Sequence, residues 1–303
     1  MMDYEQAEYW ADKAIELDPS FTKGFYRRGM ARLHLLKFKE AKSDFTHVLQ
    51  DSPQDSSAKK QINICNQKIK EAAFLEAIRI EEFELTLENI EKIEISPNYK
   101  GLRVPDDLNI EFVLDLIAQL KEEIPIPKHD VLMIMFKAKQ IFEQQPSLVD
   151  INFTDDQKMI VCGDVHGQFF DFIKIFEELT GYPSPQNLYL FNGDFVDRGP
   201  YALEILLVML SLKAVFPNHF YMSRGNHEFS HLNKIYGFEK EVLKKYDEDV
   251  FLMFVQLFNT IPIAHVINQK VFVVHGGLCS DRNVTLDDIR KIDRRTCPES
   301  NLN

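Results

Sequence analysis

The sequence predicts two parts of different fold class, an all-α repeat segment followed by an α/β domain. The first sixty residues match themselves at an offset of 34 residues, which is typical of paired-helix repeats. From Gln157 onward, short apolar runs alternate with helical stretches, and that alternation is typical of a βαβ architecture. Residue types that bind metals follow each of these apolar runs. This third observation locates a candidate site in the second part.

The composition fits two folded domains in a chain of 303 residues. Hydrophobic residues make up 45% of the chain and charged residues 27%. A net charge of −12 argues against a nucleic-acid partner, because nucleic-acid binders normally present a basic face. The four cysteines have no CxxC spacing and therefore predict neither a disulfide framework nor a zinc ribbon. They are Cys65, Cys162, Cys279 and Cys297.

The sequence also predicts where the protein resides. The N-terminus lacks the basic and apolar regions of a signal peptide. No apolar run approaches the roughly 20 residues that span a bilayer. We therefore expect a cytoplasmic or nuclear protein with no membrane partner.

The repeat is visible in four pairs of similar residues that lie 34 positions apart. A period of this length closed by a proline is the signature of tetratricopeptide repeats. We predict one complete copy over 22–49, preceded by only the second helix of another copy, over 4–17. A helix over 58–80 is expected to cap the last repeat, so the repeat segment spans 1–80. The aligned pairs are Tyr4 with Phe38, Ala7 with Ala41, Ile15 with Leu49 and Pro19 with Pro53.

Residues 81–109 are predicted to be a linker, since they are acidic and are interrupted by Pro97, Gly101 and Pro105. The second domain is predicted over 110–303. It should begin with two helices, over 110–123 and 128–143. Four strands are expected after them, over 158–162, 187–191, 219–222 and 271–274.

Each predicted strand is followed by a motif that contains metal-binding residue types. Side chains at the carboxyl ends of neighbouring strands converge in space, and mixed carboxylate, amide and imidazole ligands favour manganese, iron or zinc over calcium. Any one motif alone could be an ordinary turn, but four in order, each after a strand, predict a metal site. The motifs are GDVHGQ from Gly163, GDFVDRG from Gly193, RGNHE from Arg224 and HGG from His275.

Together these motifs resemble those of the phosphoprotein phosphatase family of binuclear metallophosphatases. The YGFE run from Tyr236 and the segment 286–294 extend the resemblance, and the repeats are similar to those of the family's type-five branch. The resemblance implies an incomplete metallophosphatase α/β sandwich in the second domain. It also implies metal-dependent hydrolysis of phosphoserine and phosphothreonine in proteins by a metal-activated hydroxide.

The resemblance assigns roles to individual residues. Two divalent metal ions, manganese, iron or zinc, would be held by five side chains. His227 would be the general acid and Asp197 its orienting partner, while Arg198 and Asn226 would bind phosphate; Asp197 and Arg198 could instead form only a local ion pair. The metal ligands would be Asp164 and His166 for the first ion, Asp194 for both ions, and Asn226 with His275 for the second.

Other residues have weaker assignments. By resemblance, Lys23 and Arg27 would clamp the acidic C-terminal peptide of a heat-shock chaperone, although both could be ordinary solvated charges. Tyr236 is as consistent with packing as with a substrate contact. His219, His231 and His265 match no ligand position and are expected to be structural or surface groups.

The sequence departs from the family pattern at both ends. Family members continue beyond segment 286–294 and there carry another histidine ligand and a second phosphate-binding arginine. The resemblance therefore implies a chain truncated at both ends, with reduced phosphatase activity. The alternatives are an inactive truncated adaptor or a gene-model fragment that binds chaperones or phosphoproteins, and a metallophosphoesterase that acts on diesters or nucleotides.

Overall fold

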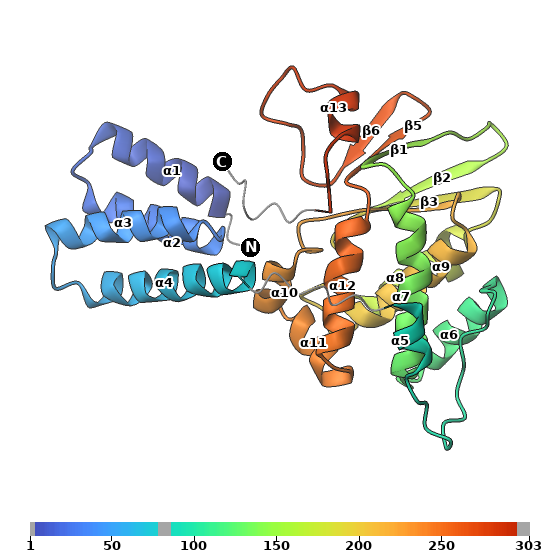
Figure 1. Ribbon diagram of the computed structural model, residues 1–303. Helices are drawn as coiled ribbons and strands as arrows, with labels where there is room; N and C mark the ends of the chain where they lie inside the picture. The colour runs from blue at the N-terminus through green and yellow to red at the C-terminus, as the bar shows by residue number, and fades with distance from the viewer. Residues whose placement is uncertain (1–3, 78–85, 296–303) are drawn as a thin grey trace. The chain divides into compact units, whose positions relative to one another are not determined.

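The computed structural model divides the chain into two compact units, Met1–Glu84 and Leu85–Asn303 (Figure 1). It describes residues 4–77 and 86–295, except for the side chains of residues 71–77. The last three residues of the predicted cap helix, 78–80, therefore lie outside the described residues, as does Cys297.

The first unit consists of four helices that pack in sequence order: α1 (Tyr4–Leu17), α2 (Thr22–His34), α3 (Phe38–Asp51) and α4 (Ser56–Ala77). Its core contains Ala41, Phe45 and Cys65, all fully buried. A Cβ atom at Gly29 would lie 3.0 Å from the Phe45 ring, so the glycine lets α2 and α3 approach closely. The tetratricopeptide arrangement predicted from the 34-residue period is confirmed.

An ion-pair network that was not predicted joins the first three helices of this unit. Buried Asp44 on α3 accepts hydrogen bonds from Arg28 at 2.6 Å and from Arg32 at 3.0 Å, both on α2. The same arginines reach Asp12 at 2.7 Å and Glu8 at 2.9 Å on α1. The two arginines compensate for the loss of water around the buried carboxylate.

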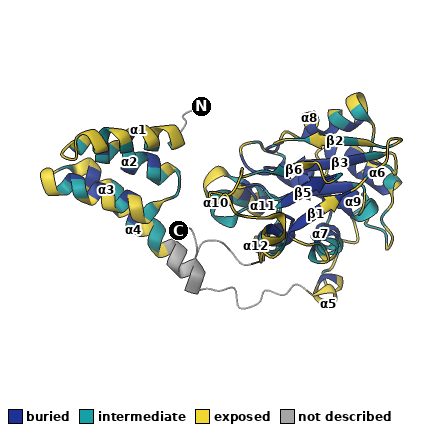
Figure 2. Ribbon diagram, turned by 90° about the horizontal axis from the view of Figure 1, so that it is seen from above, coloured by how far each residue is buried: buried dark blue, intermediate teal, exposed yellow. Residues whose placement is uncertain are grey.

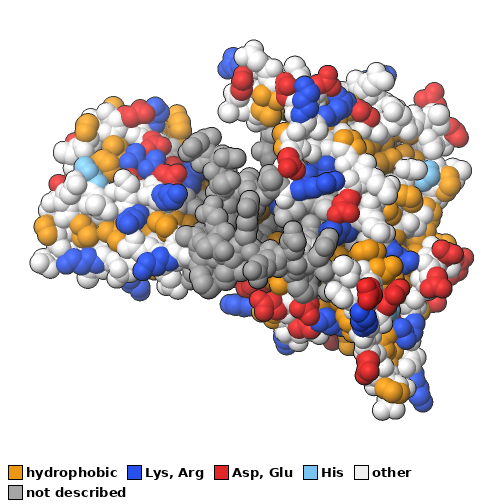
Figure 3. Space-filling model, viewed as in Figure 1, with side chains coloured by type: hydrophobic (Ala, Val, Ile, Leu, Met, Phe, Trp, Pro, Cys, Tyr) orange, Lys and Arg blue, Asp and Glu red, His pale blue; other side chains and the backbone are white. Residues whose placement is uncertain are grey.

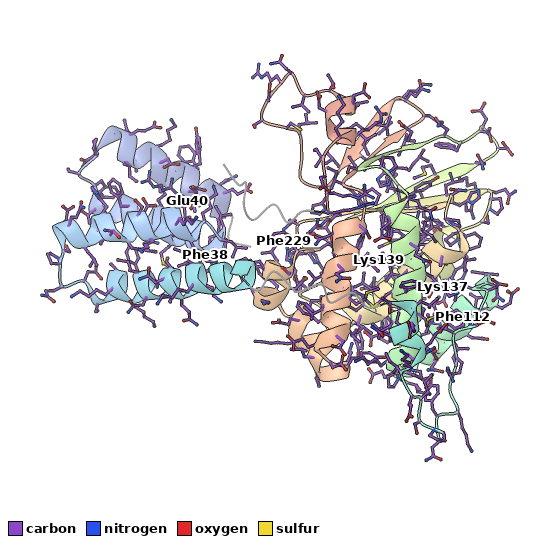
Figure 4. The ribbon with its side chains drawn as sticks, viewed as in Figure 1. Phe38, Glu40, Phe112, Lys137, Lys139 and Phe229 are labelled. Carbon is purple, nitrogen blue, oxygen red and sulfur yellow. The ribbon has the colours of Figure 1, made fainter. Side chains whose placement is uncertain are left out.

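Three helices open the second unit: α5 (Leu87–Glu91), α6 (Ile110–Lys121) and α7 (Lys128–Glu143). Asn109 caps α6 by accepting the N–H of Phe112 at 2.9 Å. Figure 4 labels Phe112 on α6 and Lys137 on α7, whose Nζ donates to the Asp106 carbonyl at 2.5 Å.

Much of the segment predicted as a linker packs on the second unit. Ile90 on α5 is fully buried, and α5 contacts α7. Leu102, Val104 and Leu108 also lie against the core. The N–H of Leu102 donates to the side chain of Gln119 on α6 at 2.8 Å. Isolated apolar residues between proline and acidic residues give no periodic signal, which is why this packing was not predicted.

Two three-stranded sheets are formed by the described residues. One has the order β2 (Lys158–Cys162), β3 (Asn187–Asn192), β4 (Phe220–Ser223), and all three strands are parallel. The other has the order β1 (Leu148–Ile151), β5 (Ala264–Ile267), β6 (Val271–Val274), in which β1 and β5 are parallel and β5 and β6 antiparallel. This is the predicted α/β sandwich.

Alternating residues of β3 and β4 form the cores on the two faces of their sheet. Leu188, Leu190 and Tyr221 face the second sheet, where they pack with Val149 and Ile267. Their neighbours in sequence face the helices instead, in the larger core that contains Tyr189, Phe191, Phe220 and Met222. In Figure 2, β1, β3 and β5 are largely buried, whereas the residues of β2 and β6 are intermediate or exposed.

The remaining helices lie between or beside the strands. The helix α9 is buried along most of its length and contacts α6, α7, α8 and α11. None of the described helices is both long and apolar enough to cross a membrane. On the face shown in Figure 3, charged side chains of both signs are interspersed over the second unit. The helices are α8 (Phe169–Lys174), the π-helix η1 (Ile175–Thr180), α9 (Ala202–Val215), α10 (Ser230–Tyr236), α11 (Phe238–Lys245), α12 (Glu248–Thr260) and α13 (Leu286–Arg290).

A histidine between the two sheets links β5 to the end of β4. His265 is fully buried, and its Nδ1 lies 3.0 Å from the hydroxyl of Ser223. Burial, together with the charge of Lys213, lowers the pKa of His265 to about 3. The structural role expected for His265 is consistent with this buried contact to Ser223.

This histidine predicts a pH dependence of stability. The folded-state pKa lies below the ordinary value of 6.5, so the unfolded chain binds the proton more readily and stability falls as the pH drops below about 6.5. Between pH 7.5 and 5, the wild-type protein should lose about 2 kcal/mol of unfolding free energy relative to His265→Gln. Hydrogen exchange of the β5 amides measures this difference. A difference that does not change with pH would show the prediction to be wrong.

Candidate metal centre

The four sequence motifs meet at one edge of the sandwich because of the strand register. In the parallel sheet, Cys162 lies opposite Phe191 and Asn192 opposite Ser223, so the loops after β2, β3 and β4 leave the sheet side by side. The loop after β6 reaches the same place from the other sheet, where the His275 Nδ1 donates to the Asn192 carbonyl at 2.6 Å. The predicted convergence of these side chains is therefore seen in the structure.

Asp194 lies at the middle of the candidate site and presents one carboxylate oxygen to each of two groups. Its Oδ2 lies 3.4 Å from the His166 Nε2, which is 3.7 Å from the Asp164 Oδ2. Its Oδ1 lies 3.3 Å from the His275 Nε2, which is 3.0 Å from the Asn226 Oδ1. All five predicted ligands thus lie together, around two positions that share Asp194.

The two imidazole rings are oriented as metal ligands are. The His166 Nδ1 is 2.7 Å from the Val196 carbonyl, as the His275 Nδ1 is from Asn192. A carbonyl only accepts, so Nδ1 carries a proton in both rings and Nε2 faces the carboxylates. The His166 Nε2 is buried and has no hydrogen-bond partner among the described residues. A lone pair facing carboxylate oxygens is unfavourable unless a cation lies between them, so this donor set fits divalent metal ions.

The backbone of these loops adopts unusual conformations. Positive φ angles occur at His166 (36°), Asp194 (56°), Asp197 (68°) and Arg198 (66°). Non-glycine residues rarely adopt such angles, at a cost of about 1–3 kcal/mol each, and they cluster at functional sites. Gly193 is required for another reason, since a Cβ there would lie 2.6 Å from the Gly225 Cα.

Asp194 and His275 shift each other's pKa. Burial alone would raise the pKa of Asp194, but hydrogen bonds from His275 and from the His227 N–H hold it below its ordinary value. The hydrogen bond to Asp194 raises the pKa of His275 to about 9, against the effect of burial. Metal ligands must be deprotonated, so a cation bound here would displace that proton.

A hydrogen-bonded pair of His227 and Asp197 lies beside these ligands. The His227 Nδ1 is 2.8 Å from the Asp197 Oδ2, and both side chains are buried. Asp197 is fixed in turn by the Phe238 N–H at 2.9 Å and by the Asn233 amide at 3.3 Å. The carboxylate therefore orients the His227 ring, whose Nε2 lies 3.4 Å from the Arg198 Nη2.

The rest of the ring environment is aromatic and partly open. The His227 ring lies 4.7 Å from the His166 ring and 5.1 Å from the Tyr236 ring, measured between centroids. Arg198, Asp164 and Asn226 are exposed, and Tyr236 is 44% exposed. Phe229, labelled in Figure 4, directly precedes α10 and lies 5.8 Å from the Arg224 guanidinium. Exposed polar groups thus border the buried Asp197–His227 pair on one side.

Some site features were not predicted. Glu228 and Asn233 are fully buried within the centre. The amide of Asn233 donates to the His227 carbonyl at 2.7 Å, and no sequence pattern marks it. Glu228 stands in the RGNHE motif, but its role was not assigned. Burial raises the pKa of Glu228 to about 7, with the charge of Asp194 acting in the same direction.

The remaining candidates lie away from the centre or take no part in it. Lys23 and Arg27 are exposed on α2 in the first unit. Cys162 is the last residue of β2 and directly precedes the loop that carries Asp164. Burial raises the pKa of its thiol to about 11, which leaves little thiolate near neutral pH.

Two family models match different parts of the chain. Residues 158–301 match the calcineurin-like phosphoesterase family, and residues 62–150 match the PPP5 TPR repeat region. Serine/threonine-protein phosphatase T of Trypanosoma brucei brucei is 40% identical over 294 residues, which cover 96% of this chain and 62% of that protein. Serine/threonine-protein phosphatase 5 of Homo sapiens is 40% identical over 95% of this chain and 58% of its own length.

A solved structure agrees with these matches. A serine/threonine phosphatase from Saccharomyces cerevisiae, with similarity to human phosphatase PP5, superposes with a TM-score of 0.62 at 43% identity. The match covers 63% of this chain and 61% of that one. The chain spans about 60% of the length of the curated relatives named above. On its repeats, its metallophosphatase fold and these relatives, the chain belongs to the phosphoprotein phosphatase family, in the branch that carries tetratricopeptide repeats.

Proposed function

We propose that the protein is a metal-dependent phosphatase that removes phosphate from phosphoserine and phosphothreonine in other proteins. The observation that carries this proposal is the position of Asp194, with one carboxylate oxygen toward His166 and the other toward His275. A carboxylate shared in this way is suited to bridging two cations. The oriented Asp197–His227 pair lies directly beside it.

The residues have separate roles in this proposal. Asp164, His166 and Asp194 would hold one manganese, iron or zinc ion, and Asp194, Asn226 and His275 the other. Two such ions supply Lewis acidity and lower the pKa of a water molecule toward neutrality.

The chain's own groups would complete the reaction. The exposed guanidinium of Arg198 would bind the phosphate oxygens with its planar fork. The His227 Nε2 would donate a proton to the leaving serine or threonine oxygen, while Asp197 holds the ring in its orientation.

We also propose that the first unit binds the acidic C-terminal peptide of a chaperone through Lys23 and Arg27. These residues are four positions apart on α2, so they share one helix face. Both are exposed and form no ion pair within the described residues. By contrast, Arg28 and Arg32 on the same helix are engaged by Asp44. The two free cations are therefore available to an anionic peptide.

Removal of metal tests the proposed phosphatase activity. The purified chain, loaded with Mn²⁺, should release phosphate from a phosphothreonine peptide, lose this activity on chelation and regain it when Mn²⁺ is restored. Asp164→Asn should lower the activity, because it weakens a metal ligand. Asp281→Asn is the matched control, since Asp281 is also an exposed loop aspartate but accepts only local bonds from Asn283. Undiminished turnover in metal-free protein would overturn the proposal.

A further inference from the structure

Glu228 is a buried carboxylate whose hydrogen-bond partners, among the described residues, are backbone N–H groups. Its Oε2 accepts the N–H of Asp194 at 2.8 Å and of Gly225 at 2.9 Å, and its Oε1 accepts the N–H of Phe195 at 2.8 Å. The side chain is fully buried and forms no ion pair within the described residues. A buried carboxylate without a cation is costly unless its oxygens are satisfied, so these three bonds hold Glu228 in place.

The three N–H groups belong to two different loops of the metal centre. Asp194 and Phe195 lie in the loop after β3, and Gly225 lies in the loop after β4. The paired register of these strands ends at Asn192 opposite Ser223, so strand pairing no longer holds the loops together beyond that point. Glu228 takes over that function.

A fourth hydrogen bond crosses between the same loops in the opposite direction. The N–H of His227 donates to the Asp194 Oδ1 at 3.0 Å. The Glu228 side chain thus fixes the backbone of the loop after β3. In return, the backbone of the loop after β4 fixes the side chain of Asp194. The loops also approach closely, as Gly193 and Gly225 show.

We propose that Glu228 is a positioning residue that holds Asp194 where its carboxylate can be shared between the two metal positions. This inference rests on the proposed metal centre. Glu228 lies too deep to contact substrate, and its own oxygens are occupied by the three N–H groups. It acts through the backbone at Asp194, whose φ of 56° needs such support.

Glu228→Gln is the informative variant because it preserves size but not acceptor capacity. One oxygen becomes an NH₂ group, which cannot accept and which faces at least one backbone N–H. The affinity of the centre for Mn²⁺ should fall by roughly 10–100-fold, as is typical when an outer partner of a metal ligand is lost. The amides of Asp194, Phe195 and Gly225 should also exchange faster with solvent in metal-free protein.

Glu241→Gln is the matched control. Glu241 is a half-buried carboxylate that also accepts backbone N–H groups, those of Ala202 at 3.3 Å and Leu203 at 3.0 Å, but it pairs with Lys245 at 2.8 Å and holds the start of α9. This variant should leave the Mn²⁺ affinity within about 2-fold of wild type. Its exchange should change at Ala202 and Leu203 instead.

The experiment measures Mn²⁺ binding and amide exchange in the full chain and in both variants. An unchanged Mn²⁺ affinity in Glu228→Gln, or an equal loss in Glu241→Gln, overturns the inference. Wild-type protein that binds no Mn²⁺ overturns the proposed function, and amide exchange then tests the positioning role alone. If Glu228→Gln does not fold, amide hydrogen exchange of the wild-type protein tests the positioning role instead. Protection of the three amides at the level of β3 supports the role, and rapid loop-like exchange overturns it.

Discussion

Replacing His227 by asparagine should lower kcat on a phosphothreonine peptide by roughly 10²–10⁴-fold, the range expected for loss of a general acid. Bound metal should be unchanged, because the five proposed ligands are other side chains. The structure supports this separation, since the His227 Nδ1 is held by Asp197 at 2.8 Å and only Nε2 is left for a substrate. Kinetics combined with metal analysis of the variant measures both effects.

The leaving group distinguishes a general acid from a ligand. Nitrophenol leaves readily without a proton, so His227→Asn should be much less impaired on nitrophenyl phosphate than on the peptide. Asn226→Ala is the matched comparison at the next residue and should lose metal and be impaired on both substrates. The comparison is needed because the ligand atoms of His227, His166 and Asp194 lie within 4.8 Å of one another, near enough to hold one ion together. Metal loss in His227→Asn, or equal impairment on both substrates, would require His227 to be reinterpreted as a ligand or structural group.

Replacing Asp194 by alanine should have the largest effect of any single substitution in the centre. This carboxylate is the only side chain proposed to hold both ions, so both metal affinities should fall together. Loss of several kcal/mol of charge stabilisation corresponds to a decrease in kcat of about 10³-fold or more. Metal content and nitrophenyl phosphate turnover measure the two consequences.

Asp164→Ala is the control for the Asp194 substitution. Asp164 lies 3.7 Å from the His166 Nε2 and within 4.8 Å of the ligand atoms of Asp194 and His275, but it is proposed to hold the first ion only, and its side chain is 52% exposed. It should weaken only the first metal position and leave one ion bound. Retention of two ions by Asp194→Ala would contradict the bridging role. Because Asp194 also accepts the His227 N–H, circular dichroism of the variant is needed to show that it remains folded.

Periodic segments of this chain were predictable, whereas isolated short ones were not. The helices over 110–121 and 128–143 and the strands over 158–162 and 271–274 follow from apolar patterning. The strands β1 and β5 are only four residues long and contain Asp150 and His265, which interrupt the apolar run. Helix α5 has a single buried residue, Ile90. Burial in such elements comes from tertiary packing, and that packing leaves no local pattern in the sequence.

The candidate site shows the same division. Its ligand types were visible because strand-end motifs place them at one edge of a sheet. The supporting groups were not, because Asn233 and Glu228 are defined by the backbone atoms that they contact. The Arg28–Asp44 network in the first unit also depends on contacts between helices. Sequence motifs reveal residues that recur in a pattern, but hydrogen bonds to backbone require the folded geometry.

The number of Mn²⁺ ions bound per chain tests the central claim most directly. Electron paramagnetic resonance of the protein at saturating Mn²⁺ both counts the ions and shows whether they are magnetically coupled. A bridging Asp194 predicts two ions per chain about 3.5–4 Å apart, with the signal of a coupled pair. No bound Mn²⁺, or a single uncoupled ion, would contradict a two-metal centre built on Asp194.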